Sequence, residues 1–200
     1  MRRALLLILL LALPGHTPLC AQWSATLLGG SITSRGDARD ALDPDHPEIR
    51  ADRLAVVTVA IGRTIGRWRV GLEGRHAGAD LSEASAAAVV TTPGVLSAWG
   101  AGFEVATRIV GRAPRPSLEV ALGAGADRWS FDLSDDSPRW RSTLRGALEA
   151  SLPLGGRWDA VIRGEVTRSP SIFRTAELPE GFQSLTAWRR GVVLGIRRRW

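Results

Sequence analysis

The C-terminal segment carries the pattern that most constrains the fold. In steps of two back from the last residue, one set is Trp200, Arg198, Ile196, Leu194, Val192 and Arg190, and the interleaved set is Arg199, Arg197, Gly195, Val193, Gly191 and Arg189. One set is largely aliphatic and finishes on an aromatic, whereas the other carries glycine and charge. Because successive side chains point to opposite faces of a β-strand, this pattern is typical of a barrel strand with one face toward a membrane.

The N-terminal 21 residues are predicted to be a secretory signal peptide. A basic start at Arg2 and Arg3 precedes an apolar run over 4–13, which is shorter than the roughly 20 residues that a transmembrane helix needs. Cleavage is expected after Ala21. Cys20 lacks the small preceding residue of a lipidation site, so lipidation is not expected. The barrel domain is therefore predicted over 22–200, without cysteine and hence without a disulfide.

The charge balance excludes some classes of partner and fold. The chain has 26 basic residues, all of them arginine, against 20 acidic residues, which gives a net charge of +6. Arginine-rich helices that could enter a nucleic-acid groove are not evident, so no nucleic-acid partner is expected. Beyond the signal peptide no run of 18 apolar residues occurs, which excludes a helical membrane protein.

Alternating apolar and polar residues mark eight strands in the mature chain. The predicted strands cover 22–33, 53–63, 66–78, 95–108, 117–130, 140–152, 157–168 and 187–200. The second of these is apolar on both faces and is the weakest case for alternation. An even number of alternating strands predicts an all-β, eight-stranded, antiparallel, up-and-down transmembrane β-barrel.

The connections between these strands alternate in length. Short turns are predicted at 63–66, 109–116 and 153–156, and mostly longer loops at 34–52, 79–94, 132–139 and 169–186. Short turns at one end and long loops at the other are typical of an outer-membrane barrel with both termini in the periplasm. The bacterial outer membrane is therefore the expected location.

The eight tryptophans are predicted to form two aromatic girdles. Four lie at strand ends beside the short turns or termini: Trp23, Trp68, Trp158 and Trp200. Four lie at strand ends beside the long loops: Trp99, Trp129, Trp140 and Trp188. Indole rings are favoured at the two membrane–water interfaces. A soluble core would instead place tryptophans at strand centres.

The opposite parity of the strands predicts a charged interior. The predicted lumen network comprises Arg69, Glu73, Arg75, Glu104, Glu119, Asp127, Arg145, Glu149, Asp159, Arg163, Glu165 and Arg197. Side chains just fill an eight-stranded barrel, so six acids and six bases are expected to pair and plug the lumen. A channel for small solutes is the alternative for this interior.

The chain resembles the small eight-stranded outer-membrane barrels of the OmpA and OmpX type over residues 22–200. The resemblance rests on strand number, loop asymmetry and the C-terminal run of Val192, Leu194, Ile196 and Trp200. In that family such a strand resembles the signal read by the barrel-assembly machinery, so this machinery is an implied partner. Arg198 departs from the family pattern, although a long arginine stem can reach the interface. No separate peptidoglycan-binding domain is expected after Trp200.

Candidate catalytic chemistry is sparse. Some barrels of this size modify lipid A with a histidine and a serine near the outer interface. Here the mature chain has His46 and His76, with Ser82 and Glu83 in the loop after His76. No His-x-Ser pair is present, and an interfacial histidine is the default interpretation of His76. No catalytic residue is predicted.

No metal or cofactor site is predicted either. The oxygen-rich cluster is Asp43, Asp45, His46 and Glu48. Two prolines interrupt it and it lacks EF-hand spacing, which favours a solvated surface loop. The Gly-Ala-Gly triplets at 100–102 and 123–125 lie inside alternating strands with no helix after them, so they do not indicate a phosphate site.

The expected function is that of a monomeric, non-enzymatic barrel embedded in outer-membrane lipids. It would act in envelope structure or in surface interaction through four extracellular loops, whose partner the sequence does not identify. Two alternatives stay open at this stage: a lipid A-modifying barrel enzyme, and a soluble periplasmic binder of lipocalin type with its aliphatic side chains turned inward.

Overall fold

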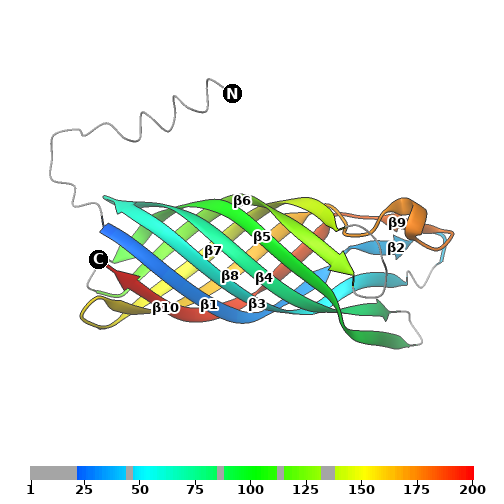
Figure 1. Ribbon diagram of the computed structural model, residues 1–200, viewed down its shortest axis with the longest axis horizontal. Coiled ribbons are helices and arrows are strands. Elements are labelled where there is room, and N and C mark those ends of the chain that lie inside the picture. The colour runs from blue at the N-terminus through cyan, green and yellow to red at the C-terminus, as the bar shows by residue number, and fades with distance from the viewer. Residues whose placement is uncertain (1–21, 44–46, 85–87, 112–114, 132–137) are drawn as a thin grey trace, which may run out of the picture.

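The computed structural model describes residues 22–43, 47–84, 88–111, 115–131 and 138–200, which form an antiparallel sheet closed into a ring (Figure 1). The long strands are β1 (Gln22–Arg35), β3 (Glu48–Ile65), β4 (Trp68–Ala84), β5 (Val89–Gly111), β6 (Ser117–Phe131), β7 (Arg139–Gly155), β8 (Trp158–Ser169) and β10 (Ala187–Arg199). Each predicted strand has a counterpart among them. The predicted signal peptide, with Cys20 and the cleavage site, lies outside the described residues.

The ring closes because β1 pairs with β10 on one side and with β3 on the other. All neighbouring pairs are antiparallel, and consecutive long strands are neighbours around the ring. When paired Cα atoms are followed from strand to strand once around the ring, the path starts at Ser151 of β7 and returns to β7 at Arg141. This displacement of ten residues reflects the tilt of the strands relative to the barrel axis. The predicted eight-stranded, antiparallel, up-and-down barrel is confirmed.

The two ends of the barrel differ. At the turn end, the connections 66–67, 112–116 and 156–157 are short, and β1 begins where β10 finishes (Figure 1). There the backbone N–H of Trp23 donates to the carbonyl of Trp200 at 3.2 Å, and the N–H of Trp200 donates back at 3.0 Å. These bonds fix the last residue of the chain to the first strand.

The loop end is built up by small elements that the sequence patterns did not predict. Strand β2 (Ala38–Asp40) pairs with both β3 and β9 (Phe182–Ser184), and the 3-10 turn η1 (Thr175–Glu177) precedes β9. The first and last long loops are thereby joined at the barrel mouth (Figure 1). Among the described residues, no helix is long and apolar enough to cross a membrane.

The prediction of a long loop over 79–94 is wrong. Strand β4 continues to Ala84 and β5 begins at Val89, so the two strands form a hairpin. A bulge makes this possible, because the register changes from Ala79 opposite Leu96 to a new alignment two residues later. At the bulge Gly94 has a φ of +66°, and its N–H donates to the Asp80 carboxylate at 2.8 Å.

The aliphatic side chains of the strand centres point outward. Leu72, Leu144, Ile162 and Leu194 are all exposed on the outside of the barrel. Their alternating neighbours are buried or half-buried, and Arg145 and Arg163 are among the buried ones. The strands therefore present an apolar band to their surroundings and a polar surface to the interior, which is the orientation of a membrane barrel.

The larger of two apolar clusters in the interior lies toward the loop end, and the smaller one comprises Leu28, Val161 and Val193. The buried residues of the larger cluster, here called the apolar cap, are Ile32, Ala51, Leu54, Val56, Ala77, Ala79, Val95, Leu96, Ala98, Trp129 and Ile172. Leu54 and Val56 face the cap, whereas Val57 and Val59 face outward. The predicted second strand is thus apolar on both faces because it contributes to both the cap and the external band.

Candidate functional site

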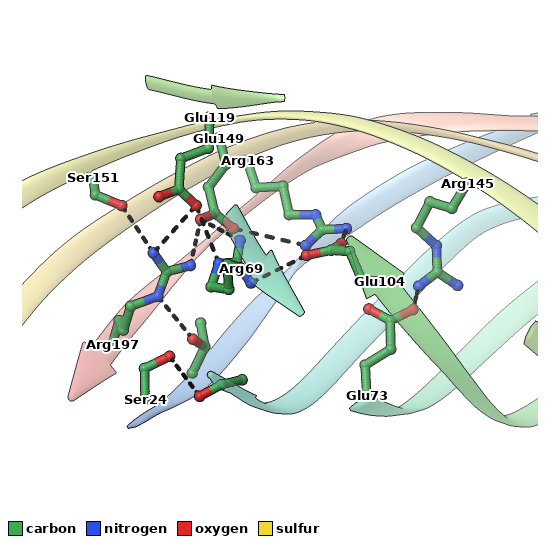
Figure 2. Close-up of polar contacts among 12 residues, drawn as sticks. Ser24, Arg69, Glu73, Glu104, Glu119, Arg145, Glu149, Ser151, Arg163 and Arg197 are labelled. Carbon is green, nitrogen blue, oxygen red and sulfur yellow. Dashed lines mark hydrogen bonds and ion pairs between the residues drawn. The ribbon is translucent and has the colours of Figure 1, made fainter. Parts of the chain in front are cut away.

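The interior toward the turn end is organised around Arg69 of β4 (Figure 2). Its guanidinium donates to Glu104 of β5 at 3.1 Å, to Glu119 of β6 at 3.1 Å and to Glu149 of β7 at 3.0 Å. Each of the three nitrogen atoms of the planar guanidinium therefore donates to a different carboxylate. Such charge-assisted bonds are among the stronger side-chain hydrogen bonds, and these cross-link four consecutive strands.

Glu149 is the most buried member of this network, with 0% of its surface exposed. Besides Arg69, its carboxylate accepts a hydrogen bond from Arg197 of β10 and lies 3.7 Å from the guanidinium of Arg163 of β8. Three arginines from three strands thus converge on one carboxylate (Figure 2). The closure strand β10 is held to the opposite wall through this group.

A second group of ion pairs lies farther from the turn end. Arg145 pairs with Glu73 across the barrel, and Arg75 donates to Glu165 at 2.5 Å. Arg163 joins the two groups, because its guanidinium also lies 3.4 Å from Glu165. The network around Arg69 is thereby linked to the Arg75–Glu165 pair farther along the barrel axis.

The structure places all twelve of the predicted lumen residues on the inside and gives each an ion-pair partner. The residues are Arg69, Glu73, Arg75, Glu104, Glu119, Asp127, Arg145, Glu149, Asp159, Arg163, Glu165 and Arg197.

Three arginines that were not among the predicted lumen residues complete these pairs. Arg199 donates to Asp159 at 2.7 Å, Arg189 lies 3.9 Å from Asp127, and Arg108 lies 3.7 Å from a carboxylate on β6. Arg189 and Arg199 share the parity of Arg197 on β10, so the alternation that identified Arg197 could have found both of them.

The start of the last long loop packs into the apolar cap at the loop end. Ile172 is fully buried in the apolar cap. Its carbonyl accepts a hydrogen bond from Arg139 at 3.0 Å, and the carbonyl of Ser171 accepts one from Arg141 at 2.5 Å. Two arginines at the start of β7 therefore hold this loop across the opening.

Asp37, between β1 and β2, secures the same loop from the other side. Its carboxylate accepts hydrogen bonds from the Ser34 hydroxyl at 3.1 Å, from the Ala51 N–H at 3.3 Å and from the Ile172 N–H at 3.5 Å. Burial raises the pKa of Asp37 above its ordinary value, and the nearby Arg189 and these hydrogen bonds only partly oppose that effect.

Replacing Asp37 with Asn is expected to flatten the pH dependence of stability. Because the pKa of Asp37 is raised on folding, the folded protein keeps this proton to higher pH than the unfolded chain does. The free energy of unfolding therefore falls as the pH rises above the ordinary value of 3.8. Urea unfolding of both proteins between pH 4 and 7 checks this. Equal slopes for the two proteins would contradict it.

Seven of the eight tryptophans predicted to form the girdles are exposed, and one is buried. Trp23, Trp68, Trp158 and Trp200 are exposed near the turn end, and Trp99, Trp140 and Trp188 are exposed on strands near the loop end. The prediction for Trp129 is wrong: it is 1% exposed and packs in the apolar cap. Its parity is that of Asp127, so it points inward, where the Arg189 guanidinium lies 4.7 Å from its ring.

The space left in the interior is small. One cavity of about 20 Å³ lies between Arg75, Asp127, Trp129 and Arg189, and another of about 30 Å³ lies at the turn end beside Arg69 and Arg197. A single water needs about 10–15 Å³ on this measure. Each of these two cavities is therefore large enough for one or two waters.

The candidate catalytic and metal residues do not assemble into a site within the described ranges. His76 stacks on Trp99 with a centroid distance of 4.3 Å, and its Nδ1 has no hydrogen-bond partner. Asp45 and His46 lie outside the described residues. In the part of the chain that the structure describes, no group of three His, Cys, Asp or Glu side chains could hold a metal ion.

Comparison with known proteins shows which solved structures have a similar fold. No protein-family model matches the sequence, and no curated protein matches it. Among solved structures, Neisserial surface protein A (NspA) aligns with a TM-score of 0.54 at 10% identity, covering 89% of this chain and 96% of its own. OprG of Pseudomonas aeruginosa aligns with a TM-score of 0.55 at 9% identity, covering 90% and 96%.

The chain has the fold of an outer-membrane β-barrel. The outer-membrane protease OmpT of Escherichia coli also aligns, with a TM-score of 0.51 at 8% identity, covering 90% of this chain and 97% of its own. The predicted resemblance to small outer-membrane barrels is thus confirmed for the fold. At these identities the likeness says nothing about a shared activity.

The C-terminal strand departs from the resembled family at Arg198, and its setting explains how the arginine is accommodated. Val192, Leu194, Ile196 and Trp200 are exposed on the outer wall of β10 and just beyond it. Arg198 is paired with Trp158 across the strands, and its guanidinium lies 5.6 Å from the ring centroid. This cation–π contact keeps the charge at the aromatic girdle. Recognition by the assembly machinery stays a prediction.

Proposed function

We propose that this protein is a closed, non-conducting and non-enzymatic outer-membrane barrel that acts in envelope structure or surface interaction through its loop end. The observation that carries the proposal is the filled interior. Arginines and carboxylates cross-link the strands around Arg69, and Ile172 seals the mouth within the apolar cap. An interior occupied in this way supports a structural scaffold rather than a transport path.

The external surface supports a location in the outer membrane. Between the two tryptophan girdles the strands carry aliphatic side chains, including Leu72 and Leu194, that would be exposed to water if the protein were soluble. A lipocalin-type binder would place its aliphatic residues inside and polar residues outside. The observed orientation is the reverse and favours hydrocarbon as the surrounding medium.

The loop end supports an interaction role because its backbone is ordered by specific contacts. The N–H of Ala41 donates to the carbonyl of Gly181 at 3.1 Å, and β2 pairs with β9. These bonds join the first and last loops into one surface beyond the barrel. A surface that is ordered before binding loses less conformational entropy when a partner docks.

Enzymatic function has weaker support. The OmpT alignment concerns a protease, but His76 packs on Trp99 at the outer wall, and among the described residues the structure shows no contact of His76 with a carboxylate or a hydroxyl. A hydrolase built on His76 would need such partners to activate a nucleophile. We therefore propose a structural monomer that depends on the barrel-assembly machinery for insertion.

Planar-bilayer recordings of the folded full-length barrel test the closed interior. The expected result is an absence of stable single-channel steps, because the two interior cavities of about 20 and 30 Å³ are separate. Cell fractionation should place the protein in the outer membrane, and the unheated protein should migrate faster on a gel than the boiled one. Large stable conductance steps would refute the closed interior, and recovery in the aqueous fraction would refute the location.

A further inference from the structure

Three arginines surround Trp188 on the outer wall at the loop end. Arg35 of β1 and Arg168 of β8 are the Cα partners of Trp188 on its two neighbouring strands, and Arg190 follows two residues later on the same face of β10. Adjacent strands lie about 4.8 Å apart and a two-residue step covers about 6.6 Å. Arg35, Arg168 and Arg190, here called the arginine cluster, therefore form one compact basic patch.

The arginine cluster has no anionic partner among the described residues. All three side chains are exposed. Among the described residues, the contact shown for a guanidinium of this cluster is that of Arg168 with the Trp188 ring, whose centroid lies 5.8 Å away. Inward-facing Arg69, by contrast, has three carboxylate partners. Arginine on the hydrocarbon-facing side of a barrel is tolerated near an interface, where an anionic group can neutralise it.

A shallow groove, open along most of its surface, begins in the wall beside this cluster. It has a volume of about 580 Å³, and Arg190 lies on its border. Gly146 and Gly164 leave its floor without side chains, and Leu148, Val166 and Val192 line it with apolar atoms. A Cβ placed on Gly164 would meet no atom within 4 Å. This glycine groove is therefore open to an apolar chain from the surrounding bilayer.

A second hollow lies on the other side of Arg168. It has a volume of about 250 Å³, and its lining residues are Ser142, Leu144, Arg168, Ser169, Pro170 and Thr186. Two of these residues, Ser142 and Thr186, are exposed and carry hydroxyl groups that can bond to the polar oxygens of a headgroup. The wall thus offers hydroxyls, positive charge and an apolar groove in succession.

We infer that this wall binds a membrane lipid whose headgroup carries phosphate. The phosphate lies against the arginine cluster, because guanidinium groups are suited to phosphate geometry, and an acyl chain lies in the glycine groove. The inference rests on the proposed placement in a membrane. It adds a defined lipid site on one sector of the wall.

The test uses the folded full-length chain in a non-ionic detergent, with lipid binding measured by native mass spectrometry. Phosphatidic acid and diacylglycerol are the probes, because they share acyl chains and differ by the phosphate. Phosphatidic acid should bind at least about tenfold more tightly, and the double variant Arg168→Gln/Arg190→Gln should lose about tenfold in affinity for it.

Gly164→Leu tests the groove separately, because a Cβ at this position meets no atom within 4 Å and the leucine side chain would extend into the groove. This variant is expected to bind phosphatidic acid more weakly. Its binding of inorganic phosphate should be unchanged, because the arginine cluster is intact. Arg128→Gln is the matched control: Arg128 is an exposed arginine between Trp99 and Trp140, away from both hollows. It should change the affinity by less than about twofold, as surface substitutions away from a site usually do.

Several results would overturn the lipid site. Equal affinity for diacylglycerol, an equal loss in Arg128→Gln, or binding that is insensitive to both the double variant and Gly164→Leu would each do so. Heat-modifiable gel mobility reports on folding of every variant. A wild-type barrel that fractionates with the outer membrane but shows no phosphate preference would contradict this inference while leaving the proposed function intact.

Discussion

Replacing Glu149 with Gln is expected to lower the free energy of unfolding by about 3–5 kcal/mol, the usual cost of breaking a buried ion pair by removing one partner. Glu149 is fully buried, and Arg69, Arg163 and Arg197 converge on it. The amide keeps the shape of the side chain but removes the negative charge, so these guanidinium groups lose part of their neutralisation in a closed interior. Urea unfolding of the barrel in phospholipid vesicles measures the effect.

Two further variants determine whether charge is the cause. Glu83→Gln makes the same chemical change at an exposed position on β4 and should alter stability by less than about 0.5 kcal/mol. Arg197→Gln added to Glu149→Gln should recover part of the loss, because the double variant also removes one of the positive charges whose neutralisation Glu149→Gln reduces. A Glu149→Gln effect no larger than that of Glu83→Gln, or strictly additive losses in the double variant, would contradict the network as the source of stability.

Alternation along single strands was sufficient to predict the barrel and the composition of its interior. On β7, for example, Leu144 and Leu148 face outward while Arg145 and Glu149 face inward. The physical reason is that the two environments, hydrocarbon and a closed polar lumen, differ more strongly than the two faces of a soluble sheet. Period-two patterning is therefore unusually informative in this class of fold.

The error at Trp129 shows where a residue-type argument overrode that alternation. Tryptophan at a strand end suggested an interfacial anchor, although its parity matched that of inward-facing Asp127. The structure places the indole in the apolar cap beside Ile172, a residue of the last loop. The cap forms only when that loop folds back into the mouth. No local sequence pattern indicates a contact between such distant parts of the chain.

The loop end of the barrel was predicted less well than the barrel wall for a related reason. Strands β2 and β9 have three residues each and exist because they pair with each other and with β3. The β4–β5 hairpin depends on a bulge at Asp80 that holds Gly94. Short strands and bulges are stabilised by partners far along the chain, so hydropathy alone predicts them poorly.

The ion pairs and the apolar cap have complementary roles in closing the barrel. Toward the turn end, charges such as Arg69 and Glu149 fix the relative positions of the strands through directional bonds. At the loop end, the cap excludes water through Ile172 and Trp129 and is tied to the wall by Asp37 and Arg139. A single breach of either region would still leave the other closed, which supports the proposed non-conducting barrel.

Replacing Leu72 with Arg is expected to destabilise the barrel in a bilayer by about 2–4 kcal/mol, as an arginine facing lipid at the membrane midplane does. Leu72 is 71% exposed on the outer wall. It lies four residues from Trp68 at the turn end and four from His76, whose Cα partner is Trp99 of the opposite girdle. Leu72 is therefore midway between the two aromatic girdles, at the depth of the bilayer midplane.

Leu42→Arg is the matched control, because Leu42 is 82% exposed but lies in the loop after β2, beyond the barrel wall. It should change the unfolding free energy by less than about 0.5 kcal/mol. In a water-soluble barrel both leucines would face solvent, and both substitutions would be equally harmless. Urea titrations in vesicles, followed by the heat-modifiable gel shift, separate these cases. Equal stability of the two variants would refute a membrane around the apolar band, whereas a selective loss in Leu72→Arg would locate hydrocarbon at the centre of the wall.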